Sequence, residues 1–144
     1  MRYIKDHENL SQKNVLLRLD LNVPLKNGLI TDQTRIDKIL PIINFLLSKN
    51  SRIIVVSHVG RPNGKKNSDL SMRPICEYLE KKINKKIKLV SDDIFRLEKK
   101  DLFKEKFDEI ICLENIRFYE KEEKNDTSFA KQLAGLADLF VNDA

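Results

Sequence analysis

The sequence of 144 residues contains only two cysteines and two histidines, and it has no long hydrophobic run. Cys76 and Cys112 each stand alone among apolar neighbours, which is typical of small core residues rather than of a disulfide or a metal pair. His7 and His58 lie far apart, without the spacing of zinc ligands. No apolar stretch is long enough to span a membrane, and charges occupy the N-terminus where a signal peptide needs its apolar region. We therefore expect a cytoplasmic protein without a metal site.

Apolar residues make up 41% of the chain and charged residues 34%, which is ordinary for a soluble globular domain. The net charge of +5 is compatible with a nucleic-acid partner. However, the lysines alternate with glutamates, as in residues 120–124, and no aromatic side chains are interleaved with the basic ones. We expect no nucleic-acid partner, and nucleic-acid binding remains an alternative to be tested.

Short apolar runs alternate with helical periodicities along the whole chain. The runs predict strands at residues 15–19, 52–57, 86–90, 109–113 and 139–141. Helices are predicted from Thr31, from Ser71 as a cap, over 94–106, and from Asp126 or Thr127. Asn27-Gly28 predicts a turn, and residues 114–125 read as a polar loop. Pro41 either lies in the first turn of a helix that begins just before it or kinks a longer helix.

This alternation predicts an α/β fold, a Rossmann-like three-layer sandwich in which helices cover both faces of a parallel β-sheet. The sequence shows no internal repeat and no low-complexity linker. The last predicted strand ends the chain without a closing helix, so we expect a fragment of a longer protein.

Polar and charged side chains follow the predicted strands at the points where they end. In open α/β sheets, ligands bind outside the carboxyl ends of the strands. The residues expected there are Asp20, Asn22, Arg35, His58, Arg61, Glu114, Asn115, Arg117, Asn142 and Asp143. So many like charges repel unless an anion or acidic side chains intervene, and arginine binds phosphate and carboxylate through two nitrogens at once. We expect a site for a small phosphorylated and carboxylated molecule.

The basic loop at residues 57–65 invites other interpretations. It could be a solvated turn that happens to be basic. It is not a P-loop, because only three residues separate Gly60 from Gly64 and Lys66 follows Lys65 in place of serine or threonine. The sequence contains no dinucleotide-binding fingerprint either.

Five motifs in order resemble the N-terminal domain of the phosphoglycerate kinase family. They cover nearly the whole chain, with conservative replacements such as Val59 and Ile116 inside them. The motifs are Arg18-Leu-Asp20-Leu-Asn22-Val-Pro24, Thr34-Arg35-Ile36, Ser57-His58-Val-Gly60-Arg61-Pro62, Leu113-Glu-Asn-Ile-Arg117-Phe118 and Phe140-Val-Asn-Asp-Ala144.

The resemblance implies a monomeric glycolytic phosphotransferase. Such a kinase moves a phosphoryl group between 1,3-bisphosphoglycerate with ADP and 3-phosphoglycerate with ATP, using Mg2+. Residues 1–144 would form the N-terminal, 3-phosphoglycerate-binding domain, incomplete at its C-terminus. The nucleotide-binding domain, which holds ATP or ADP and Mg2+, would be absent. We expect these residues alone to show no turnover.

The resemblance also implies roles for particular residues. Asp20 and Asn22, with Leu21 between them, would contact the glycerate. A second group would hold the non-transferred phosphate, namely His58, Arg61 and Arg117 with the neighbouring Val59 and Gly60. Arg35 would hold the carboxyl end and, as the catalytic residue, stabilise charge on the transferring phosphoryl group. The competing interpretation is a non-catalytic module that binds a phosphorylated ligand or a partner protein.

Overall fold

The computed structural model describes residues 9–103, 110–124 and 126–144, and a five-stranded parallel sheet forms its centre. The spatial order of the strands is β5-β6-β4-β1-β7, and every neighbouring pair is parallel. The strands are β1 (Asn14–Leu19), β4 (Arg52–Val56), β5 (Ile87–Val90), β6 (Ile110–Leu113) and β7 (Leu139–Asp143). All five predicted strands are confirmed, although Glu109 lies outside the described residues and β7 is longer than predicted.

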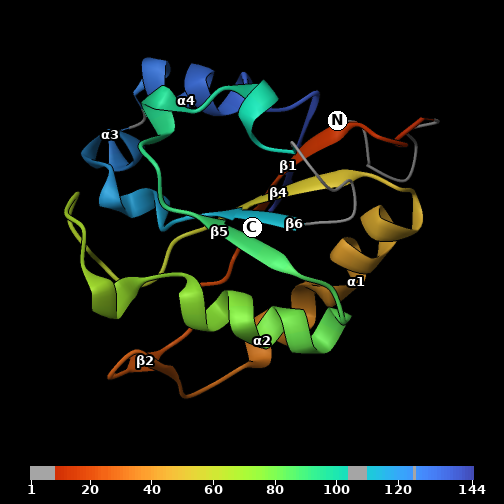
Figure 1. Cartoon of the computed structure of the whole chain (residues 1–144). Helices are drawn as coiled ribbons and strands as arrows, with labels where there is room; N and C mark the ends of the chain where they lie inside the picture. The colour runs from red at the N-terminus through yellow and green to blue at the C-terminus, as the bar shows by residue number, and fades with distance from the viewer. Residues whose placement is uncertain (1–8, 104–109, 125) are drawn as a thin grey trace.

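Helices cover both faces of this sheet (Figure 1). Helices α1 (Thr34–Ser48) and α2 (Arg73–Ile83) lie on one side, and α4 (Thr127–Ala134) lies on the other. Alternate residues of β1 enter different cores: Leu17 belongs to the cluster with α1 and α2, and Leu16 to the cluster with α4. Burial on both faces explains why the strands read as continuous apolar runs, and it confirms the predicted Rossmann-like sandwich.

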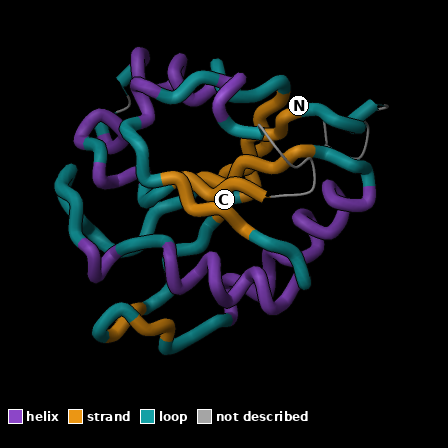
Figure 2. Tube along the Cα trace, in the orientation of Figure 1, coloured by secondary structure: helices purple, strands orange, loops and turns teal. Residues whose placement is uncertain are grey.

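A small hairpin lies apart from the central sheet, beyond α1 and α2 (Figure 2). Its strands are β2 (Leu25–Lys26) and β3 (Leu29–Ile30). Asn27 and Gly28, between them, have φ angles of 52° and 74°. Two consecutive residues with positive φ are typical of the tight hairpin turn that Asn-Gly favours, so the predicted turn is confirmed.

Helix α1 runs through Pro41 without ending there. The alternative in which the regular helix begins just before Pro41 is therefore wrong. Proline removes one backbone donor from the helix. Its ring is on the exposed face, while Ile36, Ile39 and Ile43 anchor the opposite face in the core, so packing maintains the helix across the lost bond.

The helix predicted over residues 94–106 is wrong within the described part of the chain, and 104–106 lie outside it. Two single turns replace it, η3 (Ile94–Arg96) and η4 (Lys99–Asp101). Gln132 of α4 donates from Nε2 to the carbonyl oxygens of Ile94 and Leu97 at 2.7 and 2.8 Å. Both carbonyls therefore accept from a neighbouring element, and that of Ile94 also accepts from the backbone N–H of Leu97 within the single turn of η3.

Other local predictions are confirmed or refined. The region read as a loop at 114–125 contains two short helices, η5 (Ile116–Phe118) and α3 (Glu120–Glu123). Helix α2 has Met72 at its N-cap, and the predicted cap Ser71 accepts through Oγ from the backbone N–H of Arg73. Both cysteines are unpaired and buried, as expected. No helix in the described residues has the length and apolar character needed to cross a membrane.

We expect Asp126→Ala to lower the free energy of unfolding by about 1 kcal/mol, the usual contribution of an N-cap side chain. Asp126 caps α4 by accepting from the backbone N–H groups of Ser128 and Phe129 at 2.9 and 3.2 Å. Chemical denaturation measures the loss. The control is Asp92→Ala, which removes an exposed carboxylate that caps no helix in the described residues. Equal losses in the two variants would contradict the capping role.

Candidate functional site

The segment after β1 is joined to both the start of α1 and the loop after β4. Arg35 donates from Nη1 to Asp20 Oδ1 at 3.2 Å and to the carbonyl oxygen of Asn22 at 3.0 Å. Asn22 in turn accepts through Oδ1 from the backbone N–H of Gly60 at 2.9 Å. Nearby, the backbone N–H of Leu21 donates to Ser57 Oγ at 3.1 Å. The structure thus brings four of the predicted site residues, Asp20, Asn22, Arg35 and Gly60, into one network.

The basic loop needs glycine at two positions. Gly60 and Gly64 have φ angles of 62° and 75°, in the left-handed region that side chains disfavour. A Cβ on Gly60 would lie 2.7 Å from Leu70 Cδ2, and one on Gly64 would lie 2.9 Å from Glu120 Cβ. Gly64 also donates from its backbone N–H to the carbonyl oxygen of Arg117 at 3.1 Å. The loop is therefore packed closely against the segment that follows β6.

Asn115 holds these two segments together from the interior. Its side chain is completely buried. Nδ2 donates to the carbonyl oxygens of Val59 and Leu70 at 2.8 and 2.9 Å, and Oδ1 accepts from the backbone N–H of Arg117 at 3.1 Å. The neighbouring carboxylate of Glu114 accepts at 2.7 Å from the backbone N–H of Met72, at the start of α2. One amide thus fixes the backbone of Arg117 relative to the His58–Arg61 loop.

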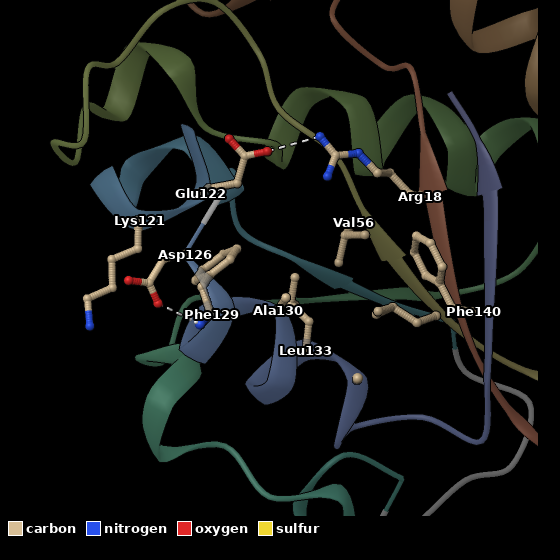
Figure 3. A pocket seen from close by; sticks show the side chains of 11 residues that line it. Arg18, Val56, Lys121, Glu122, Asp126, Phe129, Ala130, Leu133 and Phe140 are labelled. Atoms are coloured by element: carbon tan, nitrogen blue, oxygen red, sulfur yellow. Dashed lines mark hydrogen bonds and ion pairs between the residues drawn. The ribbon is translucent and has the colours of Figure 1, made fainter. Parts of the chain in front are cut away.

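Two arginines share one carboxylate beside this loop. Glu122 accepts through Oε2 from Arg117 Nε at 3.3 Å and through Oε1 from Arg18 Nη2 at 2.9 Å. Figure 3 shows the Arg18–Glu122 pair at the edge of a pocket of about 340 Å³ that is lined further in by apolar side chains such as Val56 and Phe129. The positive charge of this part of the edge is thereby partly balanced.

His58 lies within the electrostatic field of this cluster. Partial burial lowers the pKa of His58 below its ordinary value, and the positive charge of Arg117 lowers it further. Glu122 and Asp20 act in the opposite direction and Arg18 in the same direction as Arg117. We therefore expect a neutral imidazole near pH 7 in the absence of a ligand. A bound anion would favour the protonated form.

The other residues predicted at this edge are Leu21, Val59, Arg61, Asn142 and Asp143. The side chains of Leu21 and Val59 are buried in the core, so only their backbone could face a ligand. Arg61 is exposed and makes no hydrogen bond or ion pair with the rest of the described chain. Asn142 and Asp143 end β7 beside Arg18 and Leu19 of β1, at the same edge of the sheet.

The arrangement suits a small anion with several oxygen atoms. Guanidinium groups from three different elements, an imidazole and the amide of Asn22 are available around the carboxyl ends of β1, β4 and β6. Acidic partners already orient three of the guanidiniums, through Asp20 to Arg35 and through Glu122 to Arg117 and Arg18. Such an edge can bind phosphate or carboxylate groups by charge-assisted hydrogen bonds.

Sequence reasoning missed Arg18 and Glu122 as members of this cluster. A signal for Arg18 was present, because a charged residue interrupts an apolar strand two positions before Asp20 and so shares its face. Glu122 carried no comparable signal, since it lies 104 residues from Arg18 within a run of lysines and glutamates.

Comparisons with known proteins agree with one another. The family model described as phosphoglycerate kinase matches residues 4–144. The phosphoglycerate kinase of Borrelia garinii is 44% identical over the whole chain, which covers 37% of that relative. The phosphoglycerate kinase of Dictyoglomus turgidum is 48% identical over 95% of the chain and 34% of the relative. A solved phosphoglycerate kinase structure from Coxiella burnetii has a TM-score of 0.85 at 39% identity, covering 98% of this chain and 34% of that one.

We expect Asn115→Ala to destabilise the fold by about 2–4 kcal/mol, because it leaves several buried backbone groups without partners. Denaturant titration measures the loss. Asn67→Ala is the control, since Asn67 is exposed and caps only the short turn η2 (Ser68–Leu70) through the backbone N–H of Asp69. A loss in Asn115→Ala no larger than in Asn67→Ala would contradict the central role of this amide.

Proposed function

Because the chain belongs to the phosphoglycerate kinase family, we propose that its carboxyl-edge site binds 3-phosphoglycerate and 1,3-bisphosphoglycerate for phosphoryl transfer with ATP or ADP. The observation that carries this proposal is the network joining Asp20, Asn22 and Arg35 next to the cluster of His58 and Arg117. It offers polar groups for a glycerate beside positive groups for its phosphate. The chain spans about a third of the length of the curated relatives that it matches.

We assign the non-transferred phosphate to His58, Arg61 and Arg117. A phosphate dianion near the neutral imidazole would raise the pKa of His58 and offset the repulsion between the guanidiniums. The backbone of Val59 and Gly60 lies in the same loop. The exposed guanidinium of Arg61 can reach a ligand without breaking a hydrogen bond or an ion pair within the described residues.

We assign the glycerate itself to Asp20 and Asn22, and the carboxyl end to Arg35. The guanidinium of Arg35 is held by Asp20 Oδ1 and by the carbonyl oxygen of Asn22. The short segment that would contact the glycerate therefore also positions Arg35. Arg35 would then stabilise charge on the transferring phosphoryl group. This matches phosphoryl transfer, in which positioning and electrostatic stabilisation account for most of the catalysis.

We place the nucleotide and Mg2+ in the part of the relatives that this chain does not span. In the described residues, His, Cys, Asp and Glu side chains form no group of three that fits a metal ion. A cytoplasmic monomer remains our expectation from the family resemblance, with residues 1–144 acting as the glycerate-binding domain.

The first test is an NMR titration of the chain with 3-phosphoglycerate. We expect saturable binding at about millimolar Kd, or roughly −4 kcal/mol, with shifts at the loops after β1, β4 and β6. Arg61→Ala and Arg117→Ala should each weaken binding by about 1.5–3 kcal/mol, the contribution of a hydrogen bond to a charged group. The control is Arg73→Ala, an exposed arginine at the start of α2.

Other outcomes of this titration would support the alternatives. Equal affinity for inorganic phosphate would favour a general anion-binding module. Shifts caused by an oligonucleotide that vanish steeply with salt would favour nucleic-acid binding. Absence of any shift at the carboxyl edge would contradict the proposed function.

A second prediction concerns Arg35 and requires a polypeptide of the relatives' length that carries this chain. Arg35→Ala should reduce kcat more than it changes KM for 3-phosphoglycerate, because its charge is needed most in the transition state. Steady-state kinetics measures both constants, with Arg96→Ala on η3 as an exposed control. An increase confined to KM would show that Arg35 only binds the substrate.

A further inference from the structure

Glu122 is the most deeply placed carboxylate of the arginine cluster. Only 7% of its side chain is exposed, against 34% for Arg18 and 30% for Arg117. Each of its oxygens accepts from a different arginine, at 2.9 Å from Arg18 Nη2 and 3.3 Å from Arg117 Nε. A buried carboxylate that is paired on both oxygens has a fixed position, because leaving either charge alone there is costly.

We propose that Glu122 is a positioning residue, which holds the guanidinium of Arg117 in the orientation that receives the substrate phosphate. This inference rests on the proposed function, since it assigns Arg117 to that phosphate. A hydrogen bond at Nε restricts rotation about the last torsions of the arginine side chain and so fixes the plane of the guanidinium. The backbone of Arg117 is already fixed by Asn115, and the hydrogen bond from Nε to Glu122 Oε2 holds the side chain.

The position of Glu122 depends on the loop after β4. Glu122 belongs to α3, a helix of four residues that is too short to be stable by itself. Helix α3 packs against the loop, where a Cβ on Gly64 would lie 3.1 Å from Glu120 Cα. Arg18 supplies a second fixed point from β1, as Figure 3 shows. Glu122 is therefore held by elements that also carry the phosphate-binding residues.

Glu122 could instead weaken binding by competing with the phosphate for Arg117. The geometry favours positioning. The carboxylate is engaged by two arginines and nearly buried, so it is a permanent part of the cluster rather than a group that the ligand displaces. It also offsets the repulsion among Arg18, Arg117 and an imidazolium at His58, which lowers the cost of keeping these groups close together.

The test compares Glu122→Gln with Glu120→Gln in the same NMR titration. Both changes remove one carboxylate from α3, but Glu120 is exposed and pairs with Lys124. We expect Glu122→Gln to raise the Kd for 3-phosphoglycerate about three- to tenfold, which is the size of effect that residues in direct contact have on one another. Glu120→Gln should leave this Kd unchanged. Glu122→Gln should have no further effect in an Arg117→Lys background, because lysine has no Nε–H to be positioned.

Two further readouts separate positioning from general stability. Hydrogen exchange at Arg117 Nε–H should be faster in Glu122→Gln than in the unaltered chain and in Glu120→Gln. The groups that face His58 are Arg117, Arg18, Glu122 and Asp20, so removing the Glu122 charge should lower the pKa of His58 in a proton NMR titration. Loss of stability alone would leave the pKa of His58 in the folded protein unchanged, and it would speed exchange at protected backbone amides as well as at Arg117 Nε–H. If Glu122→Gln does not fold, Glu122→Asp should retain the charge and still weaken binding, because its side chain is shorter.

Several results would overturn the inference. If Glu122→Gln binds 3-phosphoglycerate at least as tightly as the unaltered chain does, Glu122 competes with the phosphate. If Glu122→Gln weakens binding by the same factor in the Arg117→Lys background as in the unaltered chain, Glu122 acts independently of Arg117. If the unaltered chain does not bind 3-phosphoglycerate, the proposed function fails. Unchanged exchange at Arg117 Nε–H in Glu122→Gln would in that case also show that Glu122 does not hold this side chain.

Discussion

The buried amide of Asn115 is the interaction on which the arrangement of the site depends. Its three hydrogen bonds join the loop after β4, the approach to α2 and the backbone of Arg117. Two of these segments are single helical turns, with Leu70 in η2 and Arg117 in η5, and the third is an irregular loop, so no sheet ladder or long helix runs through all three. A fully buried amide satisfied on both of its ends provides this constraint, because any other arrangement would leave polar atoms without partners.

The charged side chains at the carboxyl edge are also held in place by their partners. Asp20 holds Arg35, and Glu122 holds Arg117 and Arg18, so acidic groups hold guanidiniums that would otherwise repel one another. The Asp20–Arg35 pair is exposed, whereas Glu122 is almost buried, so the second interaction is less screened by solvent. A ligand with several anionic oxygens then meets groups that are already oriented, and less entropy is lost on binding.

The sequence predicted those features that depend on local pattern. The parallel sheet was predictable because its strands are buried on both faces and so read as apolar runs, as in Ile53–Val56. The carboxyl-edge residues followed from the strand ends. The helix over 94–106 was wrong because its periodicity is local, whereas the bonds from Gln132 that replace it come from α4. Glu122 was missed for a related reason, since Arg18 is remote from it in the sequence and Glu122 itself lies within a run of lysines and glutamates.

The layers of the fold contribute different parts of the site. Arg35 comes from α1, on one face of the sheet, and Glu122 comes from α3, which packs with α4 on the other face. Strand β1 supplies Arg18, Asp20 follows that strand directly, and the basic loop follows β4. The two halves of the site therefore meet only when both layers are packed on the same strands. This makes the geometry of the edge sensitive to the cores beneath it, and a substitution in either core can alter that geometry without touching a residue of the edge.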